Sequence, residues 1–265
     1  MSSGLRINKG ADDPSGLAIA KHMEAQIGGI RQATQNAEDG INLIHMADGV
    51  LAETHLVLMR MRDLTVKAAN QATLTSSDMT RLGNEMTSLR SEIDRKSQVI
   101  SFNSKAMFTG GFTSGQVLQI GPDNGANHVL TIVVRSMALF GLGLQSAAAS
   151  PWPDGPIFVA SVVVGSVVLA SSVAYAQNAI DYINSAINIV SDTRASLGIQ
   201  ERRLAYIVND LKAEDINISA AKSRIWDADM AQEITEFTRL QILQQSGTAI
   251  LGQANALPQS ILKLL

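Results

Sequence analysis

The sequence predicts a mainly α-helical protein: an elongated antiparallel helical bundle or coiled coil with a small β-hairpin region in the middle. Apolar residues recur every seven positions in long segments near both ends, which is the spacing of a helical seam. The composition agrees, because 46% of the chain is hydrophobic but only 4% is aromatic. Aromatic side chains bury the most area per residue, so a largely aliphatic chain suits long helix seams better than a compact globule.

The N-terminal part, residues 1–103, is predicted to form two helices. Asp12 or Asp13 can cap the first helix, and Pro14 follows at an early position where its missing N–H costs nothing. The first helix is expected to run from about Ser15 to Ala72, and the second to end near Phe102-Asn103. The heptad row of the first helix consists of Leu43, Val50, Val57 and Leu64.

The middle part, residues 104–156, changes character. Val117–Ile120 and His128–Val134 are rich in β-branched residues and flank the turn-like residues 121–125, a pattern that predicts a β-hairpin. We expect Asn124 and Gly125 to supply the unusual backbone angles of its turn. A loop follows over Gly141–Pro156.

The C-terminal part divides at residue 229. In residues 157–229 an unbroken heptad row predicts a long helix that pairs with the N-terminal helices: Ile183, Val190, Leu197, Leu204, Leu211, Ile218 and Ile225. Residues 230–265 predict one more helix with an apolar side: Leu240, Leu243, Ile250, Leu257, Ile261 and Leu264. This last stripe has no partner within the chain, so we interpret it as an interface with other molecules and expect the helix to be frayed in the free monomer.

One apolar segment, Ile157–Ala176, has about the length of a membrane span and no charged residue. It therefore leaves a membrane-anchored helical protein as one alternative. Five Ser or Gly residues within it and the lack of flanking basic residues argue against a span. We interpret it as a buried strand or the start of the long helix.

Nothing in the sequence predicts catalysis or a cofactor. The chain has no cysteine, which excludes disulfides, zinc thiolate sites and thiol nucleophiles. Its four histidines are scattered and match no metal-ligand spacing. The net charge of −3 and the absence of a dense basic patch argue against nucleic-acid binding. We therefore expect no enzyme, no catalytic or metal site, no cofactor and no small-molecule substrate.

Motifs at both ends of the chain resemble bacterial flagellin. LQIG at 118–121 resembles the short hairpin of that family. The remaining motifs occur in the family's order along the chain: SSGLRIN at Ser2–Asn8, ADDPSGLAIA at Ala11–Ala20, Gln32–Leu51, Met59–Asn70, Glu92–Asn103, Ala220–Glu233 and Gln241–Leu265.

The resemblance implies a structural subunit that polymerises into the bacterial flagellar filament used for motility. Its main partners are then other flagellin subunits, together with the flagellin export chaperone and the flagellar cap and hook-junction proteins. The location is extracellular, after export by the flagellar type III apparatus, and MSSGLRIN is not a cleavable signal peptide. The family begins with a further amphipathic segment before SSGLRIN, so we expect an N-terminally truncated short flagellin.

A second hypothesis is a surface protein on the same scaffold that acts as an adhesin or an innate-immune receptor ligand. In relatives that the vertebrate Toll-like flagellin receptor binds, the resemblance places the receptor surface at Arg60, Leu64 and Glu92. The interpretation we prefer is that these residues pack or form salt bridges within the filament.

Overall fold

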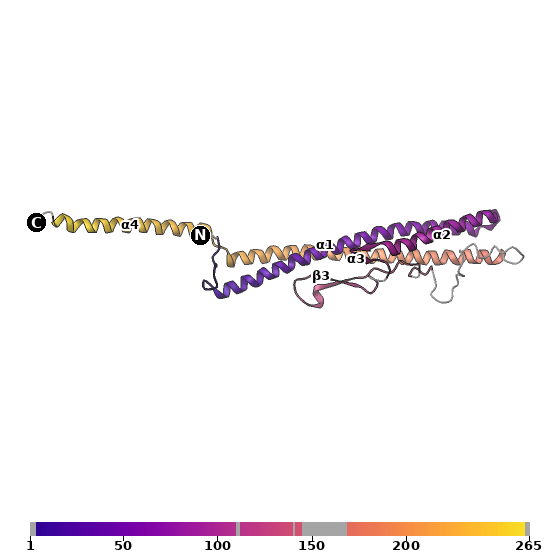
Figure 1. Cartoon of the computed structure of the whole chain (residues 1–265), viewed down its shortest axis with the longest axis horizontal. Coiled ribbons are helices and arrows are strands. Elements are labelled where there is room, and N and C mark those ends of the chain that lie inside the picture. Colours follow the sequence, from indigo (N-terminus) through magenta and orange to yellow (C-terminus); the bar gives the residue numbers. More distant parts are fainter. Residues whose placement is uncertain (1–3, 110–111, 140, 145–168, 263–265) are drawn as a thin grey trace. The chain divides into compact units, whose positions relative to one another are not determined.

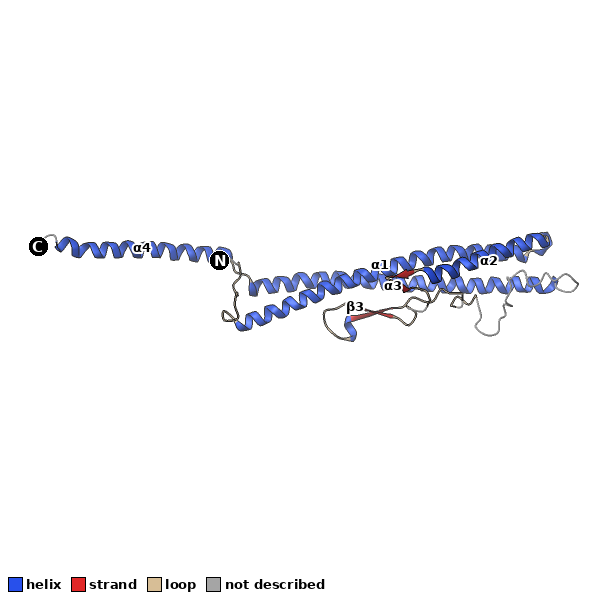
Figure 2. Cartoon of the chain, in the orientation of Figure 1, coloured by secondary structure: helices blue, strands red, loops and turns tan. Residues whose placement is uncertain are grey.

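The computed structural model describes residues 4–109, 112–139, 141–144 and 169–262. Most of these residues belong to four helices, so the predicted mainly α fold is confirmed (Figure 2). The helices are α1 (Pro14–Ala69), α2 (Ser76–Val99), α3 (Leu169–Trp226) and α4 (Met230–Leu262). The chain divides into two compact units: Met1–Gly29 with Ala213–Leu265 (unit 1), and Ile30–Lys212 (unit 2).

Helix α1 begins where the sequence predicts a capped start. Asp13 Oδ1 accepts hydrogen bonds from the backbone N–H groups of Gly16 at 2.9 Å and Ser15 at 3.1 Å. These bonds stabilise the carboxylate and so lower the pKa of Asp13. The helix ends at Ala69, and a 3₁₀ turn over Gln71–Thr73 leads to the next helix.

Helix α2 begins with a capping box. The backbone N–H of Asp78 donates to Thr75 Oγ1, and the backbone N–H of Thr75 donates back to Asp78 Oδ2 at 3.1 Å. The helix ends at Val99, so the expected end near Phe102-Asn103 is wrong by a few residues. Strand β1 (Ser101–Phe102) follows directly and pairs antiparallel with β2 (Lys105–Ala106).

The predicted hairpin in the middle of the chain is present. Strand β3 (Gln116–Gln119) pairs antiparallel with β4 (Val129–Ile132), and a 3₁₀ turn over Ala126–His128 lies between them. The expected role of Gly125 is wrong, because its φ of 162° is extended backbone that any residue adopts. Asn124 likewise is not among the described residues with positive φ.

Glycine is required instead at Gly121, where the His128 side chain lies directly against the backbone. A Cβ atom at this position would overlap with His128 Nδ1. The turn is therefore shaped by a close approach of side chain to backbone rather than by a left-handed residue.

The core of unit 2 lies between the facing sides of α1, α2 and α3, which run alongside one another in Figure 1. Asp48 pairs with Arg194 at 2.7 Å, and Arg62 Nε donates to Asn184 Oδ1 at 2.9 Å. Since the numbers rise along α1 as they fall along α3, the two helices are antiparallel. Residues from the middle region, Phe108 among them, complete the same core.

The apolar segment Ile157–Ala176 falls largely outside the described residues. Its first part, 157–168, is not described, and its last residues form the first turns of α3. Of the predicted loop Gly141–Pro156, only 141–144 are described. None of the helices in the described part of the chain is both long and apolar enough to cross a membrane.

Candidate assembly surfaces

The heptad rows that the sequence singles out lie on the inner faces of the helices. In unit 2, Leu43 and Leu64 of α1 are buried, and Val50 and Val57 are half-buried against the same core. From α3, this core contains Ile183, Val190, Leu197 and Leu204, and Leu211 is buried as well. Further along α3, in unit 1, Ile218 and Ile225 are half-buried. The structure therefore brings the two predicted rows together in unit 2.

Helix α4 has a different character, since its large apolar side chains are exposed. Asp229 caps the helix, because its Oδ1 accepts hydrogen bonds from the backbone N–H groups of Ala231 at 3.0 Å and Gln232 at 3.3 Å. The exposed fractions of the predicted interface residues are 53% for Leu240, 58% for Leu243 and 65% for Ile250.

The side chains of the other three residues of the predicted α4 stripe lie outside the described part of the chain. Leu257 and Ile261 belong to the helix, but their side chains lie outside the described part, and Leu264 lies outside the described residues altogether. The exposed apolar side chains that the structure describes on this helix therefore lie in its first two thirds.

Four further apolar side chains of α4 are missed when only heptad rows are followed. They are also more than half exposed: Ile234, Phe237, Ile242 and Leu251. Because a helix turns by about 100° per residue, these four and the predicted residues together point to all sides of the helix. A helix that is apolar all round is typical of a buried position. The apolar residues of α4, taken without regard to period, are the sequence signal that would have found them.

In unit 1, a short N-terminal segment holds the end of α3. Arg6 donates from Nη2 to the carbonyl of Ile225 at 2.8 Å, and Leu5 forms an antiparallel bridge with Asp227. The Lys21 ammonium lies 5.2 Å from the centre of the Trp226 ring, a cation–π contact. These contacts hold the C-terminal end of α3 and the first residue after it, Asp227, against the N-terminal segment of the chain.

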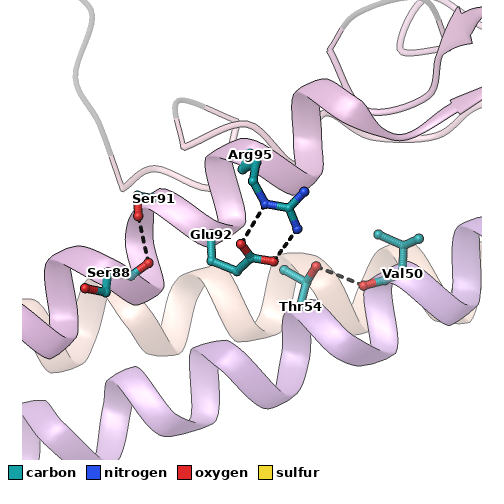
Figure 3. Close-up of polar contacts among 6 residues, drawn as sticks. All are labelled: Val50, Thr54, Ser88, Ser91, Glu92 and Arg95. Atoms are coloured by element: carbon teal, nitrogen blue, oxygen red, sulfur yellow. Dashed lines mark hydrogen bonds and ion pairs between the residues drawn. The ribbon is translucent and has the colours of Figure 1, made fainter.

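The three residues of the predicted receptor surface do not form one exposed patch. Leu64 is 3% exposed and belongs to the core. Arg60 pairs with Glu85 of α2 at 2.6 Å, and Glu92 pairs with Arg95 of the same helix at 2.7 Å. Figure 3 shows the Glu92–Arg95 pair above Thr54 of α1. The hydrogen bonds from Arg95 lower the pKa of Glu92.

The described residues contain no candidate metal site. Within residues 4–109, 112–139, 141–144 and 169–262, no three His, Asp or Glu side chains are grouped so that they could hold a metal ion. Some charged side chains link helices, as His45 of α1 does with Glu201 of α3 at 2.9 Å. This arrangement can hold a bundle together and present apolar surface to partners.

Comparison with known proteins gives the same answer over nearly the whole chain. The family model of the bacterial flagellin N-terminal helical region matches residues 1–129, and that of the C-terminal helical region matches residues 180–265. The flagellin of Bacillus subtilis is 38% identical over 286 residues, which cover all of this chain and 90% of that protein. The flagellar filament 33 kDa core protein of Treponema phagedenis is 37% identical over 274 residues, again with 100% and 90% covered.

Solved structures show the same fold. The crystal structure of Bacillus cereus flagellin matches with a TM-score of 0.50 at 24% identity, over 71% of this chain and 94% of that one. A putative flagellar hook-associated protein from Vibrio parahaemolyticus matches with a TM-score of 0.63 at 15% identity, over 82% and 100%. The family matches and the identities to curated flagellins lead to one conclusion: this chain belongs to the bacterial flagellin family and is a structural subunit of the flagellar filament.

Proposed function

We propose that α4 is the segment through which this subunit enters the core of the filament, where helices of other copies surround it. The observation that carries the proposal is the exposure of large apolar side chains on all sides of α4. Seven such residues are 53–65% exposed: Ile234, Phe237, Leu240, Ile242, Leu243, Ile250 and Leu251. If covering the exposed part of each contributes about 1 kcal/mol, the helix as a whole contributes on the order of 7 kcal/mol to association.

The remaining parts of the chain then have distinct roles. Residues 1–103 and 157–229 supply the helical inner domain, and residues 104–156 a short β-hairpin and variable region. Residues 230–265 supply the filament-core helix. The family models match an N-terminal helical region over residues 1–129 and a C-terminal helical region over residues 180–265, which supports separate N-terminal and C-terminal helical parts.

Before assembly, the same apolar helix needs protection from non-specific association. We assign this role to the flagellin export chaperone, acting before export through the flagellar type III apparatus. The flagellar cap and hook-junction proteins are the partners expected at the ends of the filament. No feature of the described residues favours the adhesin or receptor-ligand alternative, because Leu64 is buried and the charges of Arg60 and Glu92 are paired within the chain.

A charge placed on α4 tests the proposal. Leu243→Glu puts a carboxylate where an apolar partner is expected, and Val99→Glu, at a site 63% exposed at the end of α2, is the matched control. After salting-out of each purified protein, negative-stain microscopy and sedimentation measure the polymer formed. We expect the control to polymerise like the unmodified chain and Leu243→Glu to remain unassembled, with an unchanged thermal melt of the bundle. Equal polymerisation of both variants would refute the proposal.

A further inference from the structure

The turn of the β3–β4 hairpin contains an asparagine that is followed directly by glycine. Asn124–Gly125 is the only Asn-Gly pair in the sequence. Both residues are exposed, and they lie between the last residue of β3, Gln119, and the first residue of β4, Val129. Exposed loop tips are restricted least by the rest of a fold, so local reactions between neighbouring groups are most accessible there.

The hydrogen bonds of this turn hold the residues on both sides of the pair and leave its central peptide unit free. Gln119 Nε2 donates to the carbonyls of Gly121 and Asp123, both at 2.9 Å. The carbonyl of Gly125 accepts a hydrogen bond at 3.0 Å from the backbone N–H three residues later. Among the described residues, neither the Asn124 side chain nor the peptide unit that joins it to Gly125 makes a hydrogen bond. This peptide unit can therefore rotate without the loss of a bond.

We propose that Asn124 is a site of spontaneous deamidation, in which the backbone nitrogen of Gly125 is the nucleophile and water is the co-reactant. The nitrogen gives its proton to hydroxide and attacks Cγ of Asn124. A C–N bond forms there, and the side-chain amide leaves as ammonia, so that a succinimide ring results. The attack is intramolecular, which removes the entropic cost of bringing the two groups together.

Water then opens the ring at one of its two carbonyl carbons. Attack at Cγ breaks the new C–N bond and leaves an aspartyl residue at position 124. Attack at the backbone carbonyl carbon breaks the original peptide bond instead and leaves an isoaspartyl residue, in which the chain continues through Cγ. The net change in both cases is an amide and water converted to a carboxylic acid and ammonia.

Glycine at position 125 makes this asparagine the most reactive one in the described part of the chain. Glycine has no Cβ, so the attacking nitrogen is unhindered. Asn103 is also exposed, but Ser104 follows it, and both residues are held in the left-handed region with φ of 47° and 63°. Asn36 lies within α1, and its side chain donates to a carbonyl of the hairpin at 3.1 Å. Helical backbone nitrogens are held by their own hydrogen bonds and cannot turn toward a side chain.

The product differs from the original chain by its charge at the hairpin tip. The new carboxylate is ionised at neutral pH and lies next to Asp123, which is also exposed. The buried residues of the hairpin, Ile120 and Leu130, lie outside the reacting pair. We therefore expect the deamidated chain to remain folded and to form a distinct, more acidic species.

Incubation of the purified full chain at several pH values tests the proposal. Native isoelectric focusing follows the acidic species, with Asn124→Asp as the marker for its position. Peptide mass spectrometry locates the converted amide, and an isoaspartyl methyltransferase with a labelled methyl donor measures the isoaspartyl product. We expect the acidic species to map to Asn124 and to form faster as pH rises, because the attacking nitrogen must lose its proton.

Two variants separate this reaction from other sources of acidic protein. Asn124→Gln removes the group that closes the succinimide ring, so the acidic species should be absent. In Gly125→Ala the extended φ suits alanine and the added Cβ lies 3.5 Å from the nearest histidine atom, so the turn should still form. The methyl group hinders the nitrogen and should slow the reaction by about tenfold or more. Gly49→Ala, in α1, is the matched control and should leave the rate unchanged.

The Asp48–Gly49 pair of α1 supplies an internal comparison. The same ring closure is possible there with loss of water, but the helix fixes the backbone nitrogen, so isoaspartate should form at this pair in urea and not in the folded chain. An absence of conversion at Asn124, an equal acidic species in Asn124→Gln, or an equal rate in Gly125→Ala would overturn the proposal. Isoaspartate at Asp48 in the folded chain, formed as fast as at Asn124, would also overturn it. No arm of the experiment requires polymerisation, so the result is independent of the role of α4.

Discussion

Replacement of Gly40 by alanine tests how closely the hairpin packs on the bundle. Gly40 lies in the interior of α1, where glycine normally weakens a helix by about 1 kcal/mol relative to alanine. A Cβ atom at this position would lie 2.5 Å from Leu118 Cδ2 of β3 and 3.3 Å from Leu204 Cδ1 of α3. The Asn36 side chain holds the same strand on α1 by donating to the carbonyl of Gln119 at 3.1 Å. The missing side chain therefore makes room for the hairpin.

Two opposing terms decide the effect of Gly40→Ala. The gain in helix propensity is about 0.8–1 kcal/mol. Displacement of Leu118 from a packed position costs about 1–3 kcal/mol. The net change is therefore close to zero or destabilising by up to about 2 kcal/mol. At about 2–4 °C per kcal/mol for a chain of this size, Tm is unchanged or falls by up to about 8 °C.

Thermal melts followed by circular dichroism measure the change, with Gly49→Ala as the matched control. Gly49 lies in the same helix, and a Cβ atom there would meet no other atom within 4 Å, so alanine should raise Tm by about 2–4 °C. In a Leu118→Ala background the severe overlap is removed and only the 3.3 Å contact with Leu204 remains, so Gly40→Ala should be less destabilising there than in the unmodified chain. A rise in Tm for Gly40→Ala in the unmodified chain equal to that for Gly49→Ala would refute this account.

Three further predictions concern the bundle, the hairpin and the helix cap. Leu204→Ala, at a side chain with 0% exposure, should destabilise the protein by about 2–5 kcal/mol in a thermal melt. Equal effects from Leu204→Ala and from Arg202→Ala, at an exposed site, would contradict the assignment of Leu204 to the buried row of α3. Gly121→Ala should lower Tm because its Cβ overlaps with a histidine ring, and Gly125→Ala, whose Cβ makes ordinary contact, should be tolerated; the reverse order would disprove the close approach. The capping hydrogen bonds lower the pKa of Asp78 from its ordinary 3.8, so the stabilisation is complete above that pH and is lost as pH falls through the lower folded-state value. Helicity measured against pH should show this acid loss in the unmodified chain and a smaller loss in Asp78→Asn, where Asp13 and Glu92, whose pKa values are also lowered, still titrate.

The long helices could be predicted from the sequence because their signals are local and repeated. The heptad row from Ile183 to Leu204 contains an apolar residue at every step, and the whole row is buried as expected. The sequence also predicts the capped start of α1 near Asp13. The carboxylate provides a hydrogen-bond acceptor for the first N–H groups of the helix, and the proline that follows has backbone angles suited to the first helical position.

The errors arose where short-range patterns do not determine the structure. The end of α2 was misplaced because Ser101–Phe102 forms a strand only through its pairing with Lys105–Ala106. Residue type favours Gly125 for the turn, but the histidine that lies against Gly121 comes from the far side of the turn. In α4, the seven-residue rows mark only one side of a helix whose apolar residues point to all sides.

The bond from Arg6 to the carbonyl of Ile225 joins residues 219 positions apart, which has a consequence for the order of folding. A growing chain emerges from the ribosome with its first residues long before their binding site exists. Contacts of such separation require almost the whole polypeptide and form late, because the entropy of closing a long loop must be overcome first. The hairpin and the α1–α2 pair need only neighbouring sequence and can form early. Unit 1 is therefore the last part of this protein to become structured, and a chain that stops before residue 225 cannot complete it.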